Sequence, residues 1–294
     1  MRNAEANLKS LERLSDAFQA AFVRCVHHEN QEDAMNAFAD VFERKEVKYR
    51  ISRRQYRMLR AAFGERMQED SFGRSLVTSR YFDTEERSLI ARSLEKPLYK
   101  EKLRVRTYGT DADRAFVELK KKFKGIVYKR RIAMTPRSAE RFLGGLPYDE
   151  ALACARGDES ARDIEPTIRS TQIAHEIEAF MDRWDVLTPS MDIAVDRIAL
   201  ASAETDEEPA VRITFDRSIF YRDSRMLDAG WTELLNSGEA IMEIKVTGSY
   251  PLWLVRALDA VEAYPTSFSK YGEAYRCIKG MGAEGRLPSN APAA

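Results

Sequence analysis

The sequence predicts an α+β protein built on an antiparallel sheet, with helices packed on the outer side of the sheet. From residue 44 onward, segments of alternating apolar and charged residues recur, which is typical of strands with one buried face. Other segments carry apolar residues at steps of three and four, which is typical of amphipathic helices. The charged positions of the strands are mostly Lys and Arg, so we expect one face of the sheet to be cationic.

Composition limits the classes of protein that fit this chain. Its 294 residues are 44% hydrophobic, which is enough for a sizeable core. Lys and Arg together number 47, as do Asp and Glu, so the whole-chain basic excess of a dedicated nucleic-acid binder is missing. No apolar run is long enough for a membrane span and residues 1–10 do not resemble a signal peptide, so we expect a cytoplasmic protein. The three cysteines form no CxxC pair, which argues against a zinc cluster.

Residues 1–41 are predicted to form an amphipathic helical extension. One apolar stripe at helical spacing supports this prediction; it consists of Leu8, Leu11, Leu14, Phe18, Phe22 and Val26. A helix of this kind either packs on its own domain or binds a partner protein.

Strands dominate the next part of the chain. Residues 44–51 alternate between charged and apolar side chains, and Ser52 with Gln55 then forms a capping box that opens a helix. A strand over 76–84 and a short helix over 85–94 follow. Strands over 100–108, 115–124 and 126–134 are separated by short polar or glycine-containing turns, which predicts an antiparallel meander. These elements place the start of the main domain near residue 42.

The second half returns from helices to strands. Thr135 followed by Pro136 predicts a helix start, and residues 171–184 carry a helical stripe. Strands are predicted over 191–200, 210–216 and 240–246, with a hairpin loop over 203–209. Helices over 251–263 and 270–279 close a single domain that covers residues 42–280. The Gly, Pro and Ala content of residues 281–294 predicts a disordered tail.

Cations gather on one face of the predicted strands. A solvated outer face explains each strand alone, but such faces usually mix both charges with neutral polar residues. Here twelve cations stand against four carboxylates, an excess of eight positive charges in a chain with no net charge. The cations are Lys48, Lys102, Arg104, Arg106, Lys120, Lys122, Lys129, Arg131, Arg197, Arg212, Lys245 and Lys270. The carboxylates are Glu46, Glu118, Asp216 and Glu243.

If the sheet closes into a barrel with these faces inward, its interior is a cationic tunnel that requires a polyanion. Phosphate fits better than carboxylate metabolites, because Arg binds phosphate oxygens bidentately and a phosphate chain engages many cations at once. A divalent metal held by a glutamate and phosphate oxygens would neutralise a reacting triphosphate. No Walker A loop is present, so nucleotide binding would rest on these cations.

The motifs that carry these charges resemble one family. They are Phe42-Glu43-Arg44, Ser79-Arg80-Tyr81-Phe82-Asp83-Thr84, Lys102-Leu-Arg104-Val-Arg106, Glu118-Leu-Lys120-Lys-Lys122, Tyr128-Lys129-Arg130-Arg131, Asp196-Arg197, Val211-Arg212, Ile241-Met-Glu243-Ile-Lys245, Pro251-Leu-Trp253 and Phe268-Ser269-Lys270-Tyr271. Their order over residues 42–275 is similar to that of the vacuolar transporter chaperone (VTC) polyphosphate polymerase domain. The resemblance implies the triphosphate tunnel fold, a closed antiparallel barrel of about eight strands.

The resemblance also implies an activity, which is transfer of the terminal phosphate of ATP to a polyphosphate chain. The expected metal is divalent, manganese or magnesium, with Glu243 as its ligand. The implied catalytic residues are Lys48, Arg104, Arg106, Lys120, Arg131, Arg212 and Lys245. The implied substrate-binding residues are Glu46, Lys102, Glu118, Lys122, Lys129, Arg197, Asp216, Ser269 and Lys270.

Two features keep other functions open. Related triphosphatases and cyclases carry Glu-x-Glu-x-Lys on the first strand, whereas this chain has Arg44-x-Glu46-x-Lys48, which removes one metal carboxylate. A single remaining metal ligand, Glu243, does not distinguish catalysis from binding. A silent polyphosphate or nucleotide-binding module and an inorganic triphosphatase therefore remain alternatives to the polymerase.

Overall fold

The computed structural model describes residues 44–109, 113–124, 126–155, 164–184, 186–202, 209–226 and 228–280. One compact unit begins at Glu46 and contains nearly all of these residues. The predicted N-terminal extension over 1–41, most of the hairpin loop over 203–209 and the tail over 281–294 lie outside the described residues.

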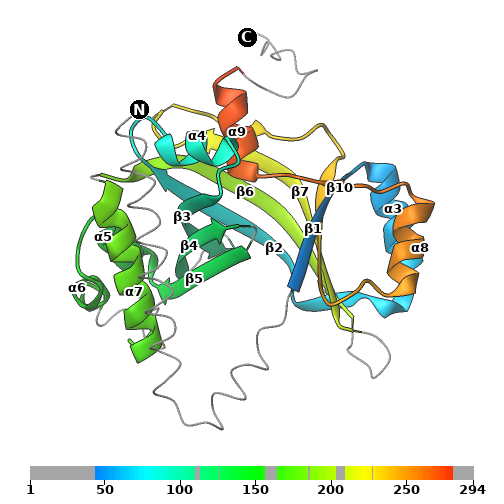
Figure 1. Cartoon of the computed structure of the whole chain (residues 1–294), viewed down its shortest axis with the longest axis horizontal. Coiled ribbons are helices and arrows are strands. Elements are labelled where there is room, and N and C mark those ends of the chain that lie inside the picture. The colour runs from blue at the N-terminus through cyan, green and yellow to red at the C-terminus, as the bar shows by residue number, and fades with distance from the viewer. Residues whose placement is uncertain are drawn as a thin grey trace. The chain divides into compact units, whose positions relative to one another are not determined.

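The α+β prediction is confirmed, and the strands form one sheet of ten (Figure 1). The path across it runs β10-β1-β9-β7-β6-β2-β3-β4-β5, and β8 pairs with β7 beside β9. The strands are β1 (Arg44–Ile51), β2 (Gln68–Asp83), β3 (Tyr99–Tyr108), β4 (Ala115–Phe123), β5 (Ile126–Met134), β6 (Thr188–Ala201), β7 (Val211–Asp223), β8 (Thr232–Glu233), β9 (Ala240–Thr247) and β10 (Pro265–Thr266). The predicted meander is present, because β3 pairs with β4 and β4 with β5 in antiparallel register.

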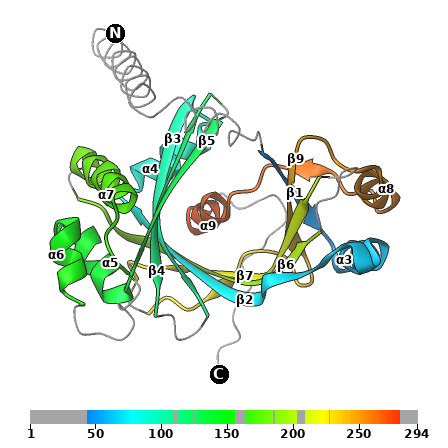
Figure 2. The same ribbon diagram turned by 90° about the horizontal axis from the view of Figure 1, so that it is seen from below.

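The prediction of a closed barrel of about eight strands is wrong for the described residues. The sheet is an open path with β10 at one end and β5 at the other, and these two strands do not pair. Figure 2 shows the reason: the sheet curls so that β1 and β9 lie on one side, β3 and β5 on the other, and helix α9 (Lys270–Ile278) lies between them. If β10 and β5 paired and closed the sheet, the space that this helix occupies would be lost.

Two groups of helices cover the apolar face of the sheet. On one side lie α3 (Arg53–Phe63) and α8 (Leu252–Ala260). On the other lie α5 (Pro136–Leu143) and α7 (Ile168–Met181), which pack on β4 and β5, and α6 (Tyr148–Ala153), which packs on α5 and α7 (Figure 1). Single 3-10 turns follow α3 at Gly64–Arg66 and α7 at Asp182–Trp184. Every helix in the described ranges is too short or too polar to cross a bilayer.

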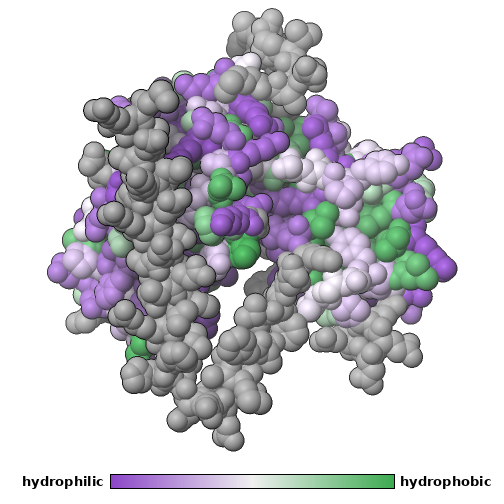
Figure 3. All heavy atoms as spheres, viewed as in Figure 1, coloured by the Kyte–Doolittle hydropathy of each residue, from purple (hydrophilic) through white to green (hydrophobic). Residues whose placement is uncertain are grey.

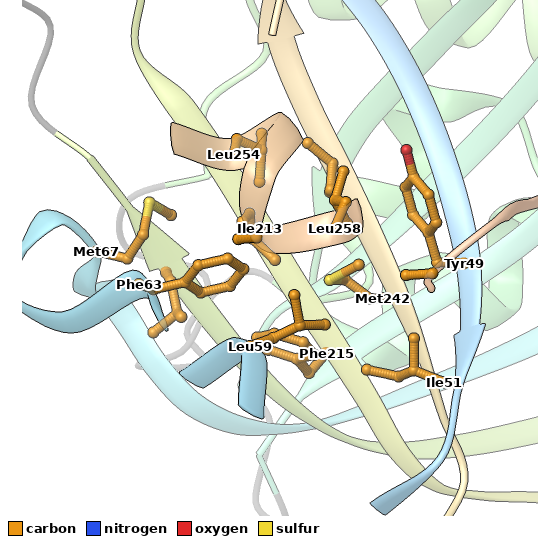
Figure 4. Close-up of a cluster of buried hydrophobic side chains, with 14 of the residues drawn as sticks. Tyr49, Ile51, Leu59, Phe63, Met67, Ile213, Phe215, Met242, Leu254 and Leu258 are labelled. Carbon is orange, nitrogen blue, oxygen red and sulfur yellow. The ribbon is translucent and has the colours of Figure 1, made fainter. Parts of the chain in front are cut away.

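In the core under α3 and α8, the alternation of apolar and charged residues determines which face of each strand is buried. Tyr49 and Ile51 of β1 point into it together with Phe215 of β7, and helix α3 adds Leu59 and Phe63 (Figure 4). Phe215 is fully buried, and removing such a side chain costs about 3–5 kcal/mol. Because these apolar residues occupy one face of each strand, the charged residues between them must point to the other face.

Local signals explain most helix boundaries. The predicted Ser52–Gln55 capping box is present, and the Thr135 side chain caps α5. Helix α4 (Ser88–Leu94) begins later than predicted because the buried carboxylate of Asp83 accepts hydrogen bonds from the backbone of Leu89 and Ile90. Helix α6 and strands β8 and β10 were not predicted, because they are too short to show a helical or strand period in the sequence.

Candidate functional site

The charged faces of the strands and the start of α9 meet on the concave side of the sheet, in what we call the cation chamber. It contains ten of the twelve cations expected there and all four carboxylates. Its cations are Lys48, Lys102, Arg104, Arg106, Lys120, Lys129, Arg131, Arg197, Lys245 and Lys270; its carboxylates are Glu46, Glu118, Asp216 and Glu243. Sequence alternation thus placed most of these residues correctly, while their functional roles stay predictions.

One wall of the chamber is organised around Glu118 of β4. Its Oε2 accepts a hydrogen bond of 2.7 Å from Nε of Arg104 on β3, and its Oε1 lies 3.1 Å from Nζ of Lys129 and 3.0 Å from Nε of Arg131 on β5. The side chain of Glu118 is only 1% exposed. Burial would raise its pKa, but Arg104 and the neighbouring cations outweigh burial and lower the pKa to about 2. The carboxylate therefore stays ionised and holds three cations at fixed positions.

The opposite wall consists of β1 and β9. Glu243 of β9 lies 2.6 Å from Nζ of Lys245 and 3.7 Å from Nζ of Lys48, measured from its carboxylate oxygens. Burial opposes ionisation of Glu243, yet Lys245 and Lys48 lower its pKa to about 2. The carboxylate of Glu46 lies 3.8 Å from Nζ of Lys48 and is more exposed than that of Glu243. This wall therefore carries alternating charges that balance one another locally.

Asp216 of β7 forms the base of the chamber. It accepts two hydrogen bonds from Arg197 of β6, at 2.6 and 2.8 Å, and a third from Nζ of Lys270 at the start of α9. Burial would raise the pKa of Asp216, but Lys270 and Arg197 hold it well below its usual range. A fully buried carboxylate with two cationic partners locks the helix start to the sheet.

The segment before α9 connects the two walls. Nζ of Lys48 donates to the carbonyl oxygen of Phe268 at 3.2 Å, and Nζ of Lys102 on β3 donates to Oγ of Ser269 at 2.8 Å. The hydroxyl of Ser269 also accepts from the backbone N–H of Gly272 and so caps the helix. These contacts take the place that strand pairing would have in a closed barrel.

The ionisation of two chamber residues is poised near neutral pH. Burial lowers the pKa of Lys102 to about 8, and the cations of Lys100, Lys120 and Lys48 act in the same direction. Burial would raise the pKa of Tyr81, but Arg104, Arg106 and Lys102 lower it to about 7. The positive charge of the chamber therefore decreases as pH rises through this range.

Three residues of β2 and β3 that line the chamber were not among the predicted site residues. The hydroxyl of Tyr81 accepts a hydrogen bond of 2.9 Å from Arg104, that of Tyr108 accepts one of 2.9 Å from Arg131, and Ser79 accepts from Arg106. Ser79 and Tyr81 are two residues apart on one strand, so alternation could have placed them on the same face.

Two predicted site residues lie at the edge of this network. Arg212 of β7 lies beside Lys245 in strand register, but its side chain is 47% exposed and contacts Asp70 at 2.8 Å, which places it at the rim. Lys122 lies opposite Lys100 near the end of β4, and its charge acts on Lys100.

The chamber fits a divalent metal only if bound phosphate supplies most of the ligands. Within the described ranges no group of three or more His, Cys, Asp or Glu side chains is arranged to hold an ion. Glu118 and Asp216 are each held by arginine together with a lysine, whereas Glu243 and the more exposed Glu46 lie beside lysines only, which makes these two the carboxylates more open to a hard cation. Because Mg²⁺ and similar ions commonly bind one carboxylate plus substrate phosphates, this donor set is compatible with a metal brought in together with a phosphate chain.

A family model covers most of the chain. The model of the VTC domain matches residues 43–279. No curated protein matches the chain. Among solved structures, a candidate adenylate cyclase from Vibrio parahaemolyticus is 11% identical, with 81% of this chain and 97% of that chain covered and a TM-score of 0.38. The PH1819 protein from Pyrococcus horikoshii OT3 is 12% identical, with 82% and 91% covered and a TM-score of 0.34.

Structural similarity at these scores carries no functional inference, whereas the family match covers most of the chain and every strand that lines the chamber. The chain belongs to the VTC domain family.

Proposed function

We propose that the cation chamber binds a chain of phosphates and that the protein is a polyphosphate polymerase, which transfers the terminal phosphate of ATP to polyphosphate. The observation that carries the proposal is the chamber itself: ten cations on one concave face, held apart by four carboxylates. Membership of the VTC domain family supports the same class of ligand.

The spacing of the cations favours a chain over a single anion. Arg104, Arg131 and Lys129 surround Glu118 on one wall, whereas Lys48 and Lys245 surround Glu243 on the other. A small carboxylate ligand reaches one of these clusters, but a phosphate chain reaches both. Guanidinium groups also bind two phosphate oxygens at once, which favours phosphate at the arginine-rich wall.

Phosphoryl transfer needs positioning and charge stabilisation more than a side-chain nucleophile. In the proposed reaction, a terminal oxygen of polyphosphate attacks the γ-phosphorus of ATP. The new P–O bond forms as the bond between the γ-phosphorus and the β,γ-bridging oxygen breaks, and ADP leaves with that electron pair. Arg104, Arg106 and Arg131 hold the triphosphate in line, and Lys48, Lys120 and Lys245 stabilise negative charge on the reacting and leaving oxygens.

A divalent metal, manganese or magnesium, would be held by Glu243 together with phosphate oxygens and would supply further charge neutralisation. Before it binds there, the contact of 2.6 Å between Glu243 and Lys245 has to open. Lys245 is then free to contact phosphate, so ligand and metal are expected to bind together.

The tight pair of Glu243 with Lys245 also supports a second candidate function. In a chamber where Lys245 already neutralises Glu243, phosphate chains bind without reacting. The protein would then be a silent polyphosphate or nucleotide-binding module. An inorganic triphosphatase is the third alternative; it uses water as the nucleophile and inorganic triphosphate, not ATP, as the phosphoryl donor.

One assay separates these functions. The full chain is incubated with Mn²⁺, or with Mg²⁺ in parallel, and with either ATP plus polyphosphate or inorganic triphosphate. Polyphosphate length, bound polyphosphate, ADP and free phosphate are measured. The polymerase produces longer chains and one ADP for each phosphate added, and Glu243→Gln abolishes both. Release of free phosphate from triphosphate without chain growth identifies the triphosphatase. Binding of polyphosphate without any product identifies the silent module and overturns the polymerase.

A further inference from the structure

A second pocket lies on the side of β1 that faces away from the chamber. Its volume is about 280 Å³, and it lies against α8 and the residues that follow this helix. Three of its eight lining residues are tyrosines, Tyr49, Tyr250 and Tyr264, and two are acidic, Asp259 and Glu262. The other three are aliphatic, so among the residues that the structure describes no Lys, Arg or His lines the pocket.

The negative charge of this pocket is not balanced by the protein. Neither Asp259 nor Glu262 forms an ion pair with any residue in the described part of the chain. Both acids lie at or just after the last turn of α8, where the negative end of the helix dipole adds to their charge. Two carboxylates and a helix C-terminus at one place favour a positively charged ligand.

The backbone holds one of these acids in an uncommon conformation. Glu262 has a φ of 52°, in the left-handed region that costs a side chain about 1 kcal/mol or more. Glycine is the usual residue at this position after a helix. The conformation keeps a carboxylate at the pocket, where glycine would relieve the strain.

Aromatic side chains complete the pocket. Tyr264 is 74% exposed, although large aromatic side chains are usually covered. The buried hydroxyl of Tyr250 lies beside the phenol of Tyr49. Burial and the neighbouring phenol of Tyr49 raise the pKa of Tyr250, so its ring remains neutral. Neutral phenol rings beside carboxylates provide cation–π contacts in addition to charge attraction.

We propose that this pocket binds the alkylammonium group of a small organic cation. The ammonium would lie between the two carboxylates and the tyrosine rings, and the methylene groups would contact Val255 and Leu258. The volume lies at the lower end of the range for ligand pockets, which fits a linear amine better than a large metabolite. The amine belongs either to a free diamine or polyamine or to a lysine side chain of a partner protein.

The pocket is separate from the cation chamber. Tyr49 lines the pocket, while the preceding residue, Lys48, points into the chamber and contacts Glu243. The cationic chamber repels an amine, so amine binding reports on the pocket and not on the proposed phosphate site. Figure 3 shows hydrophobic surface on the side where Figure 1 draws α3 and α8.

The test is calorimetric titration of the full chain, free of phosphate ligands, with 1,4-diaminobutane. The neutral isostere 1,4-butanediol is the ligand control. We expect the diamine to bind and the diol not to bind. The double variant Asp259→Asn/Glu262→Gln should weaken diamine binding at least tenfold. The matched control Glu85→Gln/Glu86→Gln, which removes two exposed carboxylates from another surface, should bind like the wild type.

Two further measurements complete the test. Tyr264→Leu, a change at an exposed position that should leave the fold intact, is expected to weaken diamine binding several-fold because a cation–π contact is lost. Titration with N-acetyl-lysine methylamide distinguishes the two sources of the amine. If this compound binds more tightly than the diamine, the ligand is a lysine side chain of a protein; if it binds more weakly, the ligand is a free amine. Failure of the wild type to bind either amine, or equal binding of amine and diol, would overturn the proposal.

Discussion

Nζ of Lys102 donates a hydrogen bond of 2.8 Å to Oγ of Ser269, and this contact joins β3 to the residue that caps α9. On the other side, Lys48 of β1 reaches the carbonyl oxygen of Phe268. Three adjacent residues, 268–270, therefore hold together parts of the sheet that are far apart along its strand order. Closure of the chamber depends on this segment more than on strand pairing.

Replacing Ser269 should separate stability from phosphate binding. Ser269→Ala removes the cap and the acceptor for Lys102, so we expect a loss of about 1 kcal/mol in the free energy of unfolding. Ser269→Asp retains a capping acceptor and should keep stability close to that of the wild type, but its negative charge should weaken triphosphate binding. Chemical denaturation and calorimetric titration measure the two effects. Equal triphosphate affinity in the wild type and the Asp variant would remove Ser269 from the phosphate site.

The apo protein should become more stable as pH rises from 7 to about 9.5. The folded state lowers the pKa of Tyr81 from 10.0 to about 7 and that of Lys102 from 10.5 to about 8. Between these values the unfolded chain binds more protons than the folded chain, so the free energy of unfolding increases with pH. Above about pH 10 the trend should reverse, because burial raises the pKa of Tyr250 and Tyr271 in the folded state.

The control for this pH dependence is the double variant Tyr81→Phe/Lys102→Arg. Phe does not titrate and Arg stays charged in both states, so the rise in stability with pH should become smaller. The measurement is denaturant unfolding at fixed ionic strength across the pH range. A stability that falls steadily from pH 7 to 9 in the wild type would show that the chamber cations are not desolvated.

Alternation along the strands predicted both the α+β class and the chamber residues, for a physical reason. In β3, the apolar Leu103 and Val105 pack under α5 and α7, so Lys102, Arg104 and Arg106 have to point the other way. A period of two in the sequence predicts which side chains of a single strand share a face. It does not predict the distance between the first and last strands of the sheet, and the prediction of a closed barrel was wrong for that reason.

The alternation of apolar and charged residues also does not predict contacts between segments that are distant in the sequence. The distance between Lys270 and Asp216 depends on how α9 enters the curl of the sheet, and nothing in residues 270–279 alone specifies that position. The late start of α4 depends on a carboxylate, Asp83, that lies at the end of the preceding strand. The pocket beside Tyr49 likewise forms only where β1, α8 and the residues after α8 meet.

Glu243→Gln should keep the fold and lose metal-dependent turnover. The amide has the shape of the carboxylate but is a poorer ligand for a hard cation. Because the substitution also frees Lys245 from its ion pair, triphosphate affinity measured without metal should stay the same or increase. Glu46→Gln, at a more exposed carboxylate beside Lys48, is the matched control and should retain more activity. Full activity of Glu243→Gln with unchanged metal dependence would exclude Glu243 as the ligand.

Arg104→Lys should weaken triphosphate binding by about tenfold or more. Arg104 holds Glu118 and Tyr81 at the same time, and the single ammonium of Lys does not reproduce the planar fork. Arg212→Lys makes the same chemical change at the rim, where the side chain is about half exposed, and should have a smaller effect. Calorimetric titration with triphosphate compares the two variants. A larger loss for the rim variant would place the bound chain outside the chamber.

The most direct test of the cation chamber is the thermal stability of the apo protein in a series of anions at equal concentration. A ligand that binds only the folded state raises its stability by mass action. Phosphate, triphosphate and polyphosphate should stabilise the protein in increasing order, because longer chains contact more cations, and added salt should reduce each effect. Triphosphate at about 10 to 100 times its dissociation constant should add about 1–3 kcal/mol and should clearly exceed citrate. Equal stabilisation by citrate and triphosphate, or none by either, would contradict a chamber built for a phosphate chain.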